Sequence, residues 1–262
     1  MLEIKDNVAL ITGGASGIGL ALAKKWVSEG GKVVIGDFND AEFGSITSEL
    51  GDANCVCVKI NVTQEADTEK LAQTAIDKFG KINLVAPCAG VIADSMMVQP
   101  DRNDPTKAKK MPLDKWQRVI DINLTGSFLT IRDAVEQMII NKCTGAVITI
   151  SSTGSLGTAG QINYSSTKAA MSVFPKVMTA ELMRRKLGAQ IRVNSVAPGY
   201  TATAMTAGMN QEALAAIEAT IPIGRMNEAE EVVSAMIELY KNEAIAGEVL
   251  FVHGGLRLGS KG

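Results

Sequence analysis

Short apolar runs alternate with amphipathic stretches along the whole chain, and this alternation limits the possible folds more than any other feature of the sequence. The runs have the length of buried strands, and the stretches between them repeat apolar residues at helical spacing. Strands that alternate with helices imply βαβ crossovers, so we expect an α/β fold with one doubly wound parallel sheet of about seven strands. The expected strands are Val8–Ile11, Lys32–Gly36, Cys55–Ile60, Ile82–Ala86, Ala146–Ile150, Ile191–Val196 and Glu248–Val252. The expected helices are Ile18–Glu29, Ala41–Leu50, Glu65–Phe79, Leu113–Ile140, Tyr164–Leu187 and Glu228–Tyr240, the last of them capped by Asn227 together with Glu230.

The composition excludes several classes of protein. With 262 residues, a formal net charge of −2 and 46% apolar residues, the chain fits one domain and offers no electrostatic footprint for nucleic acid. No apolar run approaches the roughly 18 residues of a membrane span, and the first residues do not form a signal peptide. His253 is the only histidine and the cysteines lack zinc spacing, so we expect neither a metal site nor a histidine-based triad. We therefore expect a cytoplasmic protein with no nucleic-acid or membrane partner.

Glycines punctuate the junction between the first expected strand and its helix, at Gly13, Gly17 and Gly19. Glycine lets the backbone approach a pyrophosphate closely, and the helix N-terminus offers free N–H groups to the anion. The spacing is looser than the dinucleotide fingerprint Gly-x-Gly-x-x-Gly. The turn therefore predicts dinucleotide binding, with tight strand-to-helix packing as the alternative reason for the glycines.

An acidic residue, Asp37, ends the second expected strand, eighteen residues after Gly19. A carboxylate at this separation can accept hydrogen bonds from both adenosine ribose hydroxyls and would repel a 2′-phosphate. Ser16, just before Gly17, supplies no cation for a phosphate either. The position favours NAD over NADP, although Asp37 could instead cap the turn that follows its strand.

A phenol and an amine, Tyr164 and Lys168, stand four residues apart in a stretch that is expected to be helical. One helical turn brings such side chains to the same face, where a cation favours phenolate and lowers the pKa of the tyrosine. The pair is therefore a candidate for proton transfer. The alternative is an ordinary surface pair on a helix.

The motifs occur in one order from end to end: Thr12-Gly13-Gly14-Ala15-Ser16-Gly17-Ile18-Gly19, Asn61-Val62, Ala89-Gly90, Asn123, Ser151-Ser152, Tyr164-x-x-x-Lys168 and Asn194-x-Val196-x-Pro198-Gly199. In this combination the chain resembles the short-chain dehydrogenase/reductase family, and the match covers essentially the whole sequence. The resemblance implies a Rossmann fold, with residues 1–262 forming a single dinucleotide-binding and catalytic domain. It also implies hydride transfer between NAD(H) and a secondary alcohol or ketone, most similar to 3-oxoacyl-carrier-protein reductases and hydroxyacyl or hydroxysteroid dehydrogenases.

The resemblance assigns roles to individual residues. The implied catalytic residues are Ser151, Tyr164, Lys168 and Asn123. The implied cofactor-binding residues are Gly13, Ser16, Gly17, Ile18, Gly19, Asp37, Asn61, Val62, Ala89, Gly90, Tyr164, Lys168, Pro198, Gly199, Thr201 and Thr203. Two of these assignments have alternatives. Counting back from the tyrosine favours Ser151, whereas counting forward along the strand from Gly145 gives Ser152, and Asn123 could serve only as a structural hydrogen-bonding residue at a helix distortion.

Several stretches depart from the family pattern or leave the substrate open. Pro87-Cys88 replaces a common Asn-Asn pair, and Pro175 falls inside the helix of the Tyr164 motif, where it predicts a local kink. The segment 91–112 is longer than in compact relatives and could either line the pocket or be a solvated insertion. The segment 200–226 resembles the family's substrate lid, and its apolar residues suggest an apolar or acyl-chain substrate.

The family also implies an assembly and a rival function. Its members are commonly homotetramers built through the helices expected at Leu113–Ile140 and Tyr164–Leu187. The rival is a non-catalytic NAD-binding regulator or scaffold on the same fold, since fold does not fix function.

Overall fold

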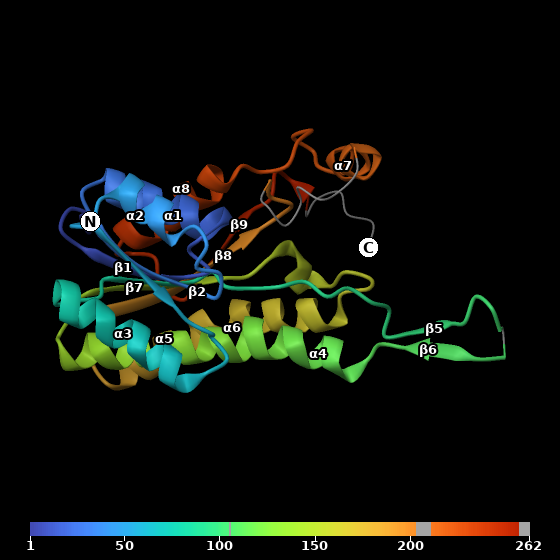
Figure 1. Cartoon of the computed structure of the whole chain (residues 1–262), viewed down its shortest axis with the longest axis horizontal. Coiled ribbons are helices and arrows are strands. Elements are labelled where there is room, and N and C mark those ends of the chain that lie inside the picture. The colour runs from blue at the N-terminus through green and yellow to red at the C-terminus, as the bar shows by residue number, and fades with distance from the viewer. Residues whose placement is uncertain (105, 203–210, 257–262) are drawn as a thin grey trace.

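A parallel sheet of seven strands forms the centre of the computed structural model, which describes residues 1–104, 106–202 and 211–256 (Figure 1). All six strand pairs of this sheet are parallel, in the order β3-β2-β1-β4-β7-β8-β9. The strands are β1 (Val8–Thr12), β2 (Lys32–Asp37), β3 (Cys55–Lys59), β4 (Leu84–Pro87), β7 (Gly145–Ile150), β8 (Ile191–Pro198) and β9 (Val249–Val252). The expected doubly wound α/β fold is confirmed.

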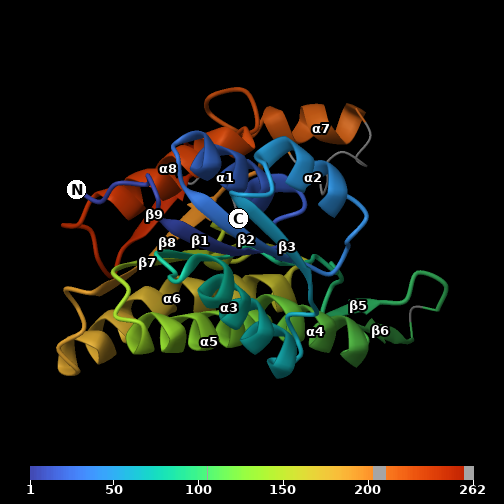
Figure 2. The same ribbon diagram turned by 60° about the vertical axis from the view of Figure 1, so that its left-hand side comes forward.

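Helices cover both faces of the sheet (Figure 2). One face carries α1 (Gly17–Ser28), α2 (Phe43–Leu50) and α8 (Ala229–Lys241), and the other carries α3 (Glu65–Phe79), α5 (Gly126–Ile140) and α6 (Ile162–Arg184). The short helices α4 (Leu113–Val119) and α7 (Gln211–Glu218) lie toward the end of the molecule where the strands finish. Expected and observed helices agree apart from their ends, except in the region of α4 and α5 and at α7, a helix that the sequence analysis did not expect.

Alternate residues of β1 enter two separate hydrophobic cores. Ala9 and Ile11 pack with α1 and α8, whereas Val8 and Leu10 pack with α3 and α5. Successive side chains of a strand point to opposite faces, so a strand covered on both sides must be apolar at every position. This requirement explains why the buried strands read as continuous apolar runs in the sequence.

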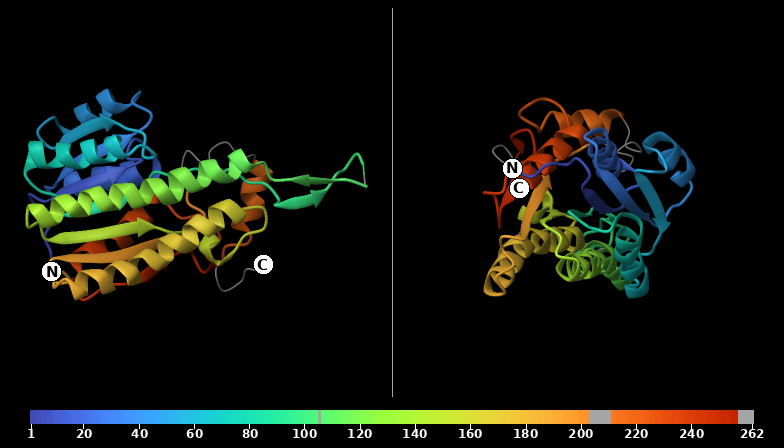
Figure 3. Two further views of the ribbon diagram at one scale, coloured as in Figure 1. Left: turned by 90° about the horizontal axis from the view of Figure 1, so that it is seen from below. Right: turned by 90° about the vertical axis from the view of Figure 1, so that its left-hand side faces the viewer.

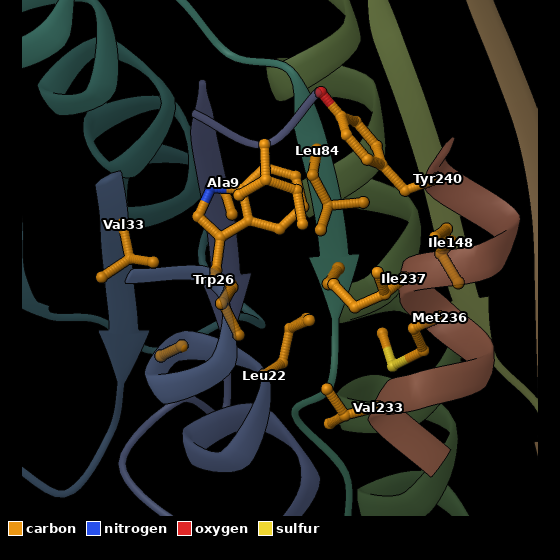
Figure 4. Packing of buried hydrophobic residues seen from close by; sticks show 14 of the residues in the cluster. Ala9, Leu22, Trp26, Val33, Leu84, Ile148, Val233, Met236, Ile237 and Tyr240 are labelled. Atoms are coloured by element: carbon orange, nitrogen blue, oxygen red, sulfur yellow. The ribbon is translucent and has the colours of Figure 1, made fainter. Parts of the chain in front are cut away.

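An aromatic pair joins the helices of the first core (Figure 4). Trp26 of α1 and Tyr240 of α8 meet edge to face, with ring centroids 4.7 Å apart. The Trp26 indole N–H donates to the carbonyl of Asn7 at 2.9 Å, and the Asn7 amide donates to the Tyr240 hydroxyl at 3.1 Å. Both polar tips are thus satisfied, and the ring contact joins α1 to α8.

The helix expected at Leu113–Ile140 is interrupted. A π-helical segment, Ile120–Thr125, separates α4 from α5 and contains the fully buried Asn123. Such bulges in a helix frequently occur at functional sites. The expectation of one regular helix over Leu113–Ile140 is therefore wrong, because this segment interrupts it.

Two further local predictions concern the N-cap of α8 and the proline inside α6. The N-cap of α8 is Glu228, paired with Glu231 in a capping box, so the expected cap of Asn227 with Glu230 is wrong by one residue. Asn227 instead donates its amide to the Val252 carbonyl at 2.7 Å. Helix α6 continues through Pro175, and the hydroxyl of Thr149 donates to the Met171 carbonyl at 2.9 Å, which replaces the N–H that proline lacks.

The segment 91–112 contains an antiparallel hairpin, β5 (Val98–Pro100) with β6 (Ala108–Lys110), that the sequence does not predict. It projects away from the body of the protein (Figures 1 and 3). Ion pairs between Lys107 and Asp104 and between Lys109 and Asp101 bridge its surface. The segment was expected either to line the pocket or to be a solvated insertion, and the projecting hairpin agrees with a solvated insertion.

Candidate active site

A cleft of about 1730 Å³ opens where the central strands end. Its walls come from the ends of β1, β2, β4, β7 and β8 and from the loops that follow them. Every described residue that was expected to bind a cofactor lines this cleft, and Thr203 lies outside the described residues. The lining residues from that set are Gly13, Ser16, Gly17, Ile18, Gly19, Asp37, Asn61, Val62, Ala89, Gly90, Tyr164, Lys168, Pro198, Gly199 and Thr201.

The glycine turn forms a closely packed cradle at one end of the cleft. Gly13 has φ of 65°, and a Cβ there would lie 2.7 Å from the Cα of Ala89. A Cβ on Gly19 would overlap the carbonyl oxygen of Gly13. The first turn of α1 begins at Gly17, holds no acidic residue and faces the cleft. Its free N–H groups therefore suit an anionic group such as a pyrophosphate.

Asp37 stands at the rim of the same cradle. One carboxylate oxygen accepts from the N–H of Ala15 at 3.0 Å, and the other accepts from the N–H of Asn39 at 3.0 Å. The second bond caps the turn after β2, so the alternative role foreseen for Asp37 is present in the structure. The first bond holds the carboxylate beside the glycine turn, where it lines the cleft.

Phe38 is a lining residue that the sequence interpretation missed. Its side chain is 72% exposed and lies at the cleft wall next to Asp37. A large aromatic ring left in solvent directly after a buried strand is a signal that could have identified it. The flat ring offers a surface on which a planar group can stack.

Lys168 is a buried amine in the wall of the cleft. Its Nζ donates to the Ile150 carbonyl at 2.9 Å and lies 5.5 Å from the centre of the Tyr164 ring. Burial lowers the pKa of Lys168 to about 8, and the nearby Cys88 thiol opposes this shift. The two side chains therefore come together as expected from their helical spacing.

The pKa of Tyr164 differs from the expectation. Burial raises the pKa of the Tyr164 phenol, a hydrogen bond with Ser152 opposes that rise, and the negative charge of Asp94 adds to it. The expected lowering by Lys168 is wrong for the protein alone, because the amine is committed to the Ile150 carbonyl. Tyr164 therefore keeps its proton at neutral pH.

The two adjacent serines take different directions at the end of β7. The buried Ser151 hydroxyl donates to the Lys168 carbonyl at 2.8 Å and lies 2.7 Å from the Ser172 hydroxyl. The Ser152 hydroxyl instead interacts with the Tyr164 phenol and accepts from the Gly154 N–H at 3.0 Å. This geometry favours Ser152, the alternative assignment, over Ser151, whose hydroxyl is committed to Lys168 and Ser172.

Asn123 supports the cleft from behind and does not line it. Its side-chain oxygen accepts from the Val91 N–H at 2.8 Å, and its amide donates to the Val91 carbonyl at 2.9 Å. The π-helical segment thus clamps the loop that carries Gly90 and Val91 into the cleft wall. In this structure the asparagine has the structural role that was its alternative assignment.

The Pro87-Cys88 departure lies directly beneath the glycine turn. The Cys88 N–H donates to the Thr12 carbonyl at 3.0 Å, and burial raises the pKa of the Cys88 thiol to about 12. The Thr12 hydroxyl is buried and has no hydrogen-bond partner among the described residues. A proline and a thiol at these positions supply no side-chain amide to this part of the site.

A polar wall from α4 and the π-helical segment completes the cleft and was also missed. Asp114, Gln117, Arg118 and Asp121 line it, and the Gln117 amide donates to Asp121 at 2.7 Å. Their spacing of three or four residues places them on one helix face, which is the signal that could have found them. On the other side, Tyr200, Ala219 and Thr220 of the expected lid segment line the cleft.

Among the described residues there is no group of three or more His, Cys, Asp and Glu side chains placed to hold a metal ion. Within the same part of the chain, none of the helices combines the length and apolar character needed to span a bilayer.

Comparisons with known proteins agree with this geometry. A family model described as short chain dehydrogenase matches residues 7–214. The chain is 33% identical over 258 residues to a 3-oxoacyl-acyl-carrier-protein reductase of Salmonella typhimurium, covering 97% of this chain and 99% of that protein. It is 34% identical over 265 residues to the reductase of the same name from Synechocystis sp., covering 98% and 99%. A Brucella melitensis structure titled short-chain dehydrogenase/reductase, glucose/ribitol dehydrogenase, has the same fold, with a TM-score of 0.85, 24% identity and coverage of 97% and 98%.

The burial of Lys168 predicts a specific pH dependence of stability. Its folded pKa of about 8 lies below the ordinary value of 10.5, so the unfolded chain binds more protons between these values. The contribution of Lys168 to stability should therefore rise with pH through this interval, so the free energy of unfolding of wild type should increase relative to that of Lys168→Met. Chemical denaturation at pH values on both sides of the interval measures the difference. Lys176→Met, which removes an exposed amine from the same helix, should follow wild type, and equal pH profiles for all three chains would contradict the prediction.

Proposed function

This chain belongs to the short-chain dehydrogenase family of oxidoreductases, which use a nicotinamide cofactor, and on that basis we propose that it transfers hydride between NAD(H) and a secondary alcohol or ketone. The observation that carries the proposal is the convergence of Tyr164, Ser152 and Lys168 on one cleft whose other end is a glycine cradle. A proton-transfer group and an anion-binding turn in one cleft are the two parts that dehydrogenation requires.

The residues divide the chemistry between them. When bound, the nicotinamide ring gives or takes the hydride at the substrate carbon. Tyr164 moves the proton to or from the substrate oxygen, and the Ser152 hydroxyl holds that oxygen beside the phenol. The raised pKa of Tyr164 keeps its proton in place at neutral pH, which suits donation to a ketone under reduction.

Lys168 has a positioning and electrostatic part in this proposal. Its amine retains two free donor positions after bonding the Ile150 carbonyl, and the side chain lines the cleft. A ribose hydroxyl of the bound cofactor is the expected acceptor. The buried positive charge near the ring would also stabilise a developing phenolate when Tyr164 gives up its proton.

Asp37 and Phe38 support NAD as the coenzyme. The Asp37 carboxylate lies at the rim of the glycine cradle, where its negative charge would repel a 2′-phosphate. Ser16, which also lines the cleft, carries no positive charge that could bind such a phosphate. Phe38 presents its exposed ring to the same part of the cleft, where an adenine can stack. The adenosine half of the cofactor would therefore be held by a charge contact and a stacking contact.

The cleft also favours a substrate with an apolar or acyl-chain part. Ile92 and Leu156 line it while remaining 40% and 58% exposed, which leaves apolar surface for a ligand to cover. The similar reductases named above act on 3-oxoacyl groups carried by acyl carrier protein. We therefore place 3-oxoacyl and 3-hydroxyacyl thioesters first among the substrates to test.

Turnover of such substrates should depend on Tyr164 and Ser152. In a nicotinamide absorbance assay over secondary alcohols and 3-oxoacyl thioesters, Tyr164→Phe should remove activity and leave NADH binding, measured by fluorescence titration, nearly unchanged. Ser152→Ala should lower kcat by about a hundredfold or more, since positioned acid–base and orienting groups contribute at this level.

Ser151→Ala provides the contrast, because it removes bonds to Lys168 and Ser172 and none to the phenol. It should cost stability and retain most of the turnover. A wild-type rate in Tyr164→Phe would end the assignment. A wild-type chain that binds NADH and turns over none of these substrates would favour the regulator or scaffold function.

The coenzyme proposal predicts a change of preference in Asp37→Ala. Loss of a charge-assisted hydrogen bond of about 1.5–3 kcal/mol should lower kcat/KM for NAD by at least about tenfold relative to that for NADP. Asp40→Ala is the matched control, because that carboxylate pairs with Lys59 at 3.1 Å. An unchanged coenzyme ratio in Asp37→Ala would contradict the ribose contact.

We further propose a homotetramer built through α5 and α6, which lie on the same face of the sheet (Figures 1 and 3). Apolar side chains on this face are left exposed, with Phe128 at 48%, Val173 at 53%, Val177 at 50% and Met183 at 69%. Light scattering should give four times the 27.6 kDa of one chain. Val177→Glu should lower that mass, whereas Val98→Glu on the hairpin, equally exposed at 51%, should leave it unchanged. The mass of a single chain for wild type would refute this assembly.

A further inference from the structure

Two thiols lie side by side on the edge of the sheet, away from the catalytic residues. Cys55 and Cys57 belong to β3, which lies at the edge of the described sheet and pairs with β2. One residue separates them, so their side chains share a face of the strand, and their sulfur atoms are 3.9 Å apart. None of the four cysteines is paired in a disulfide.

The two thiols have different environments. Cys55 is 1% exposed, whereas Cys57 is half-buried and accepts a hydrogen bond from the Thr47 hydroxyl at 3.6 Å. Hydrogen bonds from Cys55 and Thr47 lower the pKa of the Cys57 thiol to about 7. The same pairing, together with burial, raises the pKa of Cys55. A thiolate at Cys57 is therefore stabilised by a neighbouring thiol that keeps its proton.

Joining the two sulfur atoms requires a local bend of the strand. On an extended strand the Cβ atoms of residues two apart are separated by about 6.6 Å, whereas a disulfide needs roughly 3.5–4.5 Å. The bond can therefore form only if the backbone around Cys55 and Cys57 leaves the extended conformation. An edge strand has a hydrogen-bonded neighbour on one side only, so it can bend more easily than a central strand.

We propose that Cys55 and Cys57 form a peroxide-reactive dithiol, with Cys57 as the attacking thiol and Cys55 as the resolving thiol. The Cys57 thiolate attacks one oxygen of a hydroperoxide, the O–O bond breaks, and Cys57 becomes a sulfenic acid while the peroxide leaves as hydroxide or alkoxide. The Cys55 sulfur then attacks the Cys57 sulfur, and water leaves as the disulfide forms. The dithiol is oxidised by two electrons and the peroxide is reduced by two.

The other cysteines serve as internal controls. Burial raises the pKa of Cys88 to about 12, and Cys143 is buried. Neither is placed beside a second thiol among the described residues, so both should stay reduced under the same treatment. The dithiol lies outside the residues that line the cleft, so the outcome does not depend on the proposed enzymatic function.

The test treats the full chain with hydrogen peroxide, blocks free thiols with iodoacetamide and digests it with trypsin. Residues 33–59 contain no internal Lys or Arg, so both cysteines fall in one peptide. That peptide should lose two hydrogen masses and remain unalkylated, while Cys88 and Cys143 are alkylated. In Cys55→Ser the reaction should stop at a sulfenic acid on Cys57 that dimedone traps, and Cys57→Ser should give neither product.

A second measurement uses native wild type and needs no substitution. Iodoacetamide should modify Cys57 at least about tenfold faster than Cys88, because the thiolate is the nucleophile. The rate at Cys57 should be half-maximal near pH 7, the pKa of about 7 that its neighbours impose. The proposal would be overturned if the alkylation rate at Cys57 followed the titration of an ordinary thiol of pKa 9.0. It would also be overturned if peroxide left the Cys55–Cys57 peptide unoxidised.

Discussion

The burial of a parallel sheet on both faces is the constraint on which the rest of this structure depends. Each strand must hydrogen-bond along its edges and be apolar on both faces, so the polar groups of the chain collect where the strands end. Connections from β1 lead toward β2 and α1 on one side, whereas β4 is reached through α3 on the other face. The connections at β1 and β4 therefore run to opposite faces of the sheet. The cleft opens between these two strands, where the strand order reverses.

The cleft concentrates polar groups whose burial is unfavourable for the fold by itself. Lys168 is held as a buried amine with one backbone acceptor, and the Thr12 hydroxyl has no partner among the described residues. Tyr164 is made a weaker acid by the same burial. These features make sense together in the proposed enzyme, because a protonated phenol, a nearby cation and a closely packed glycine turn each suit one part of a bound cofactor and substrate.

Particular residues show why some predictions held and others did not. Gly13, Gly19 and the Tyr164–Lys168 pair were identified because local geometry fixes their relations: a turn needs glycine, and four helical residues share a face. The choice between Ser151 and Ser152 depended on strand direction. Thr149 and Ser151 both point toward α6, where they bond the carbonyls of Met171 and Lys168, so Ser152 is left facing the cleft. Counting residues could not reveal which side α6 would occupy.

The sequence by itself determined the strand and helix order, the parallel sheet, the glycine cradle and the residues that meet at the end of the strands, because these follow from periodicity and local backbone preference. Only the tertiary structure decided the π-helical turn at Asn123, the projecting hairpin, the serine beside the phenol and the acidity of Tyr164. Each of those depends on contacts between segments distant in sequence, such as Asn123 with Val91 and Lys168 with Ile150. Burial and hydrogen bonding arise from such contacts, and they set both the direction of a side chain and its pKa.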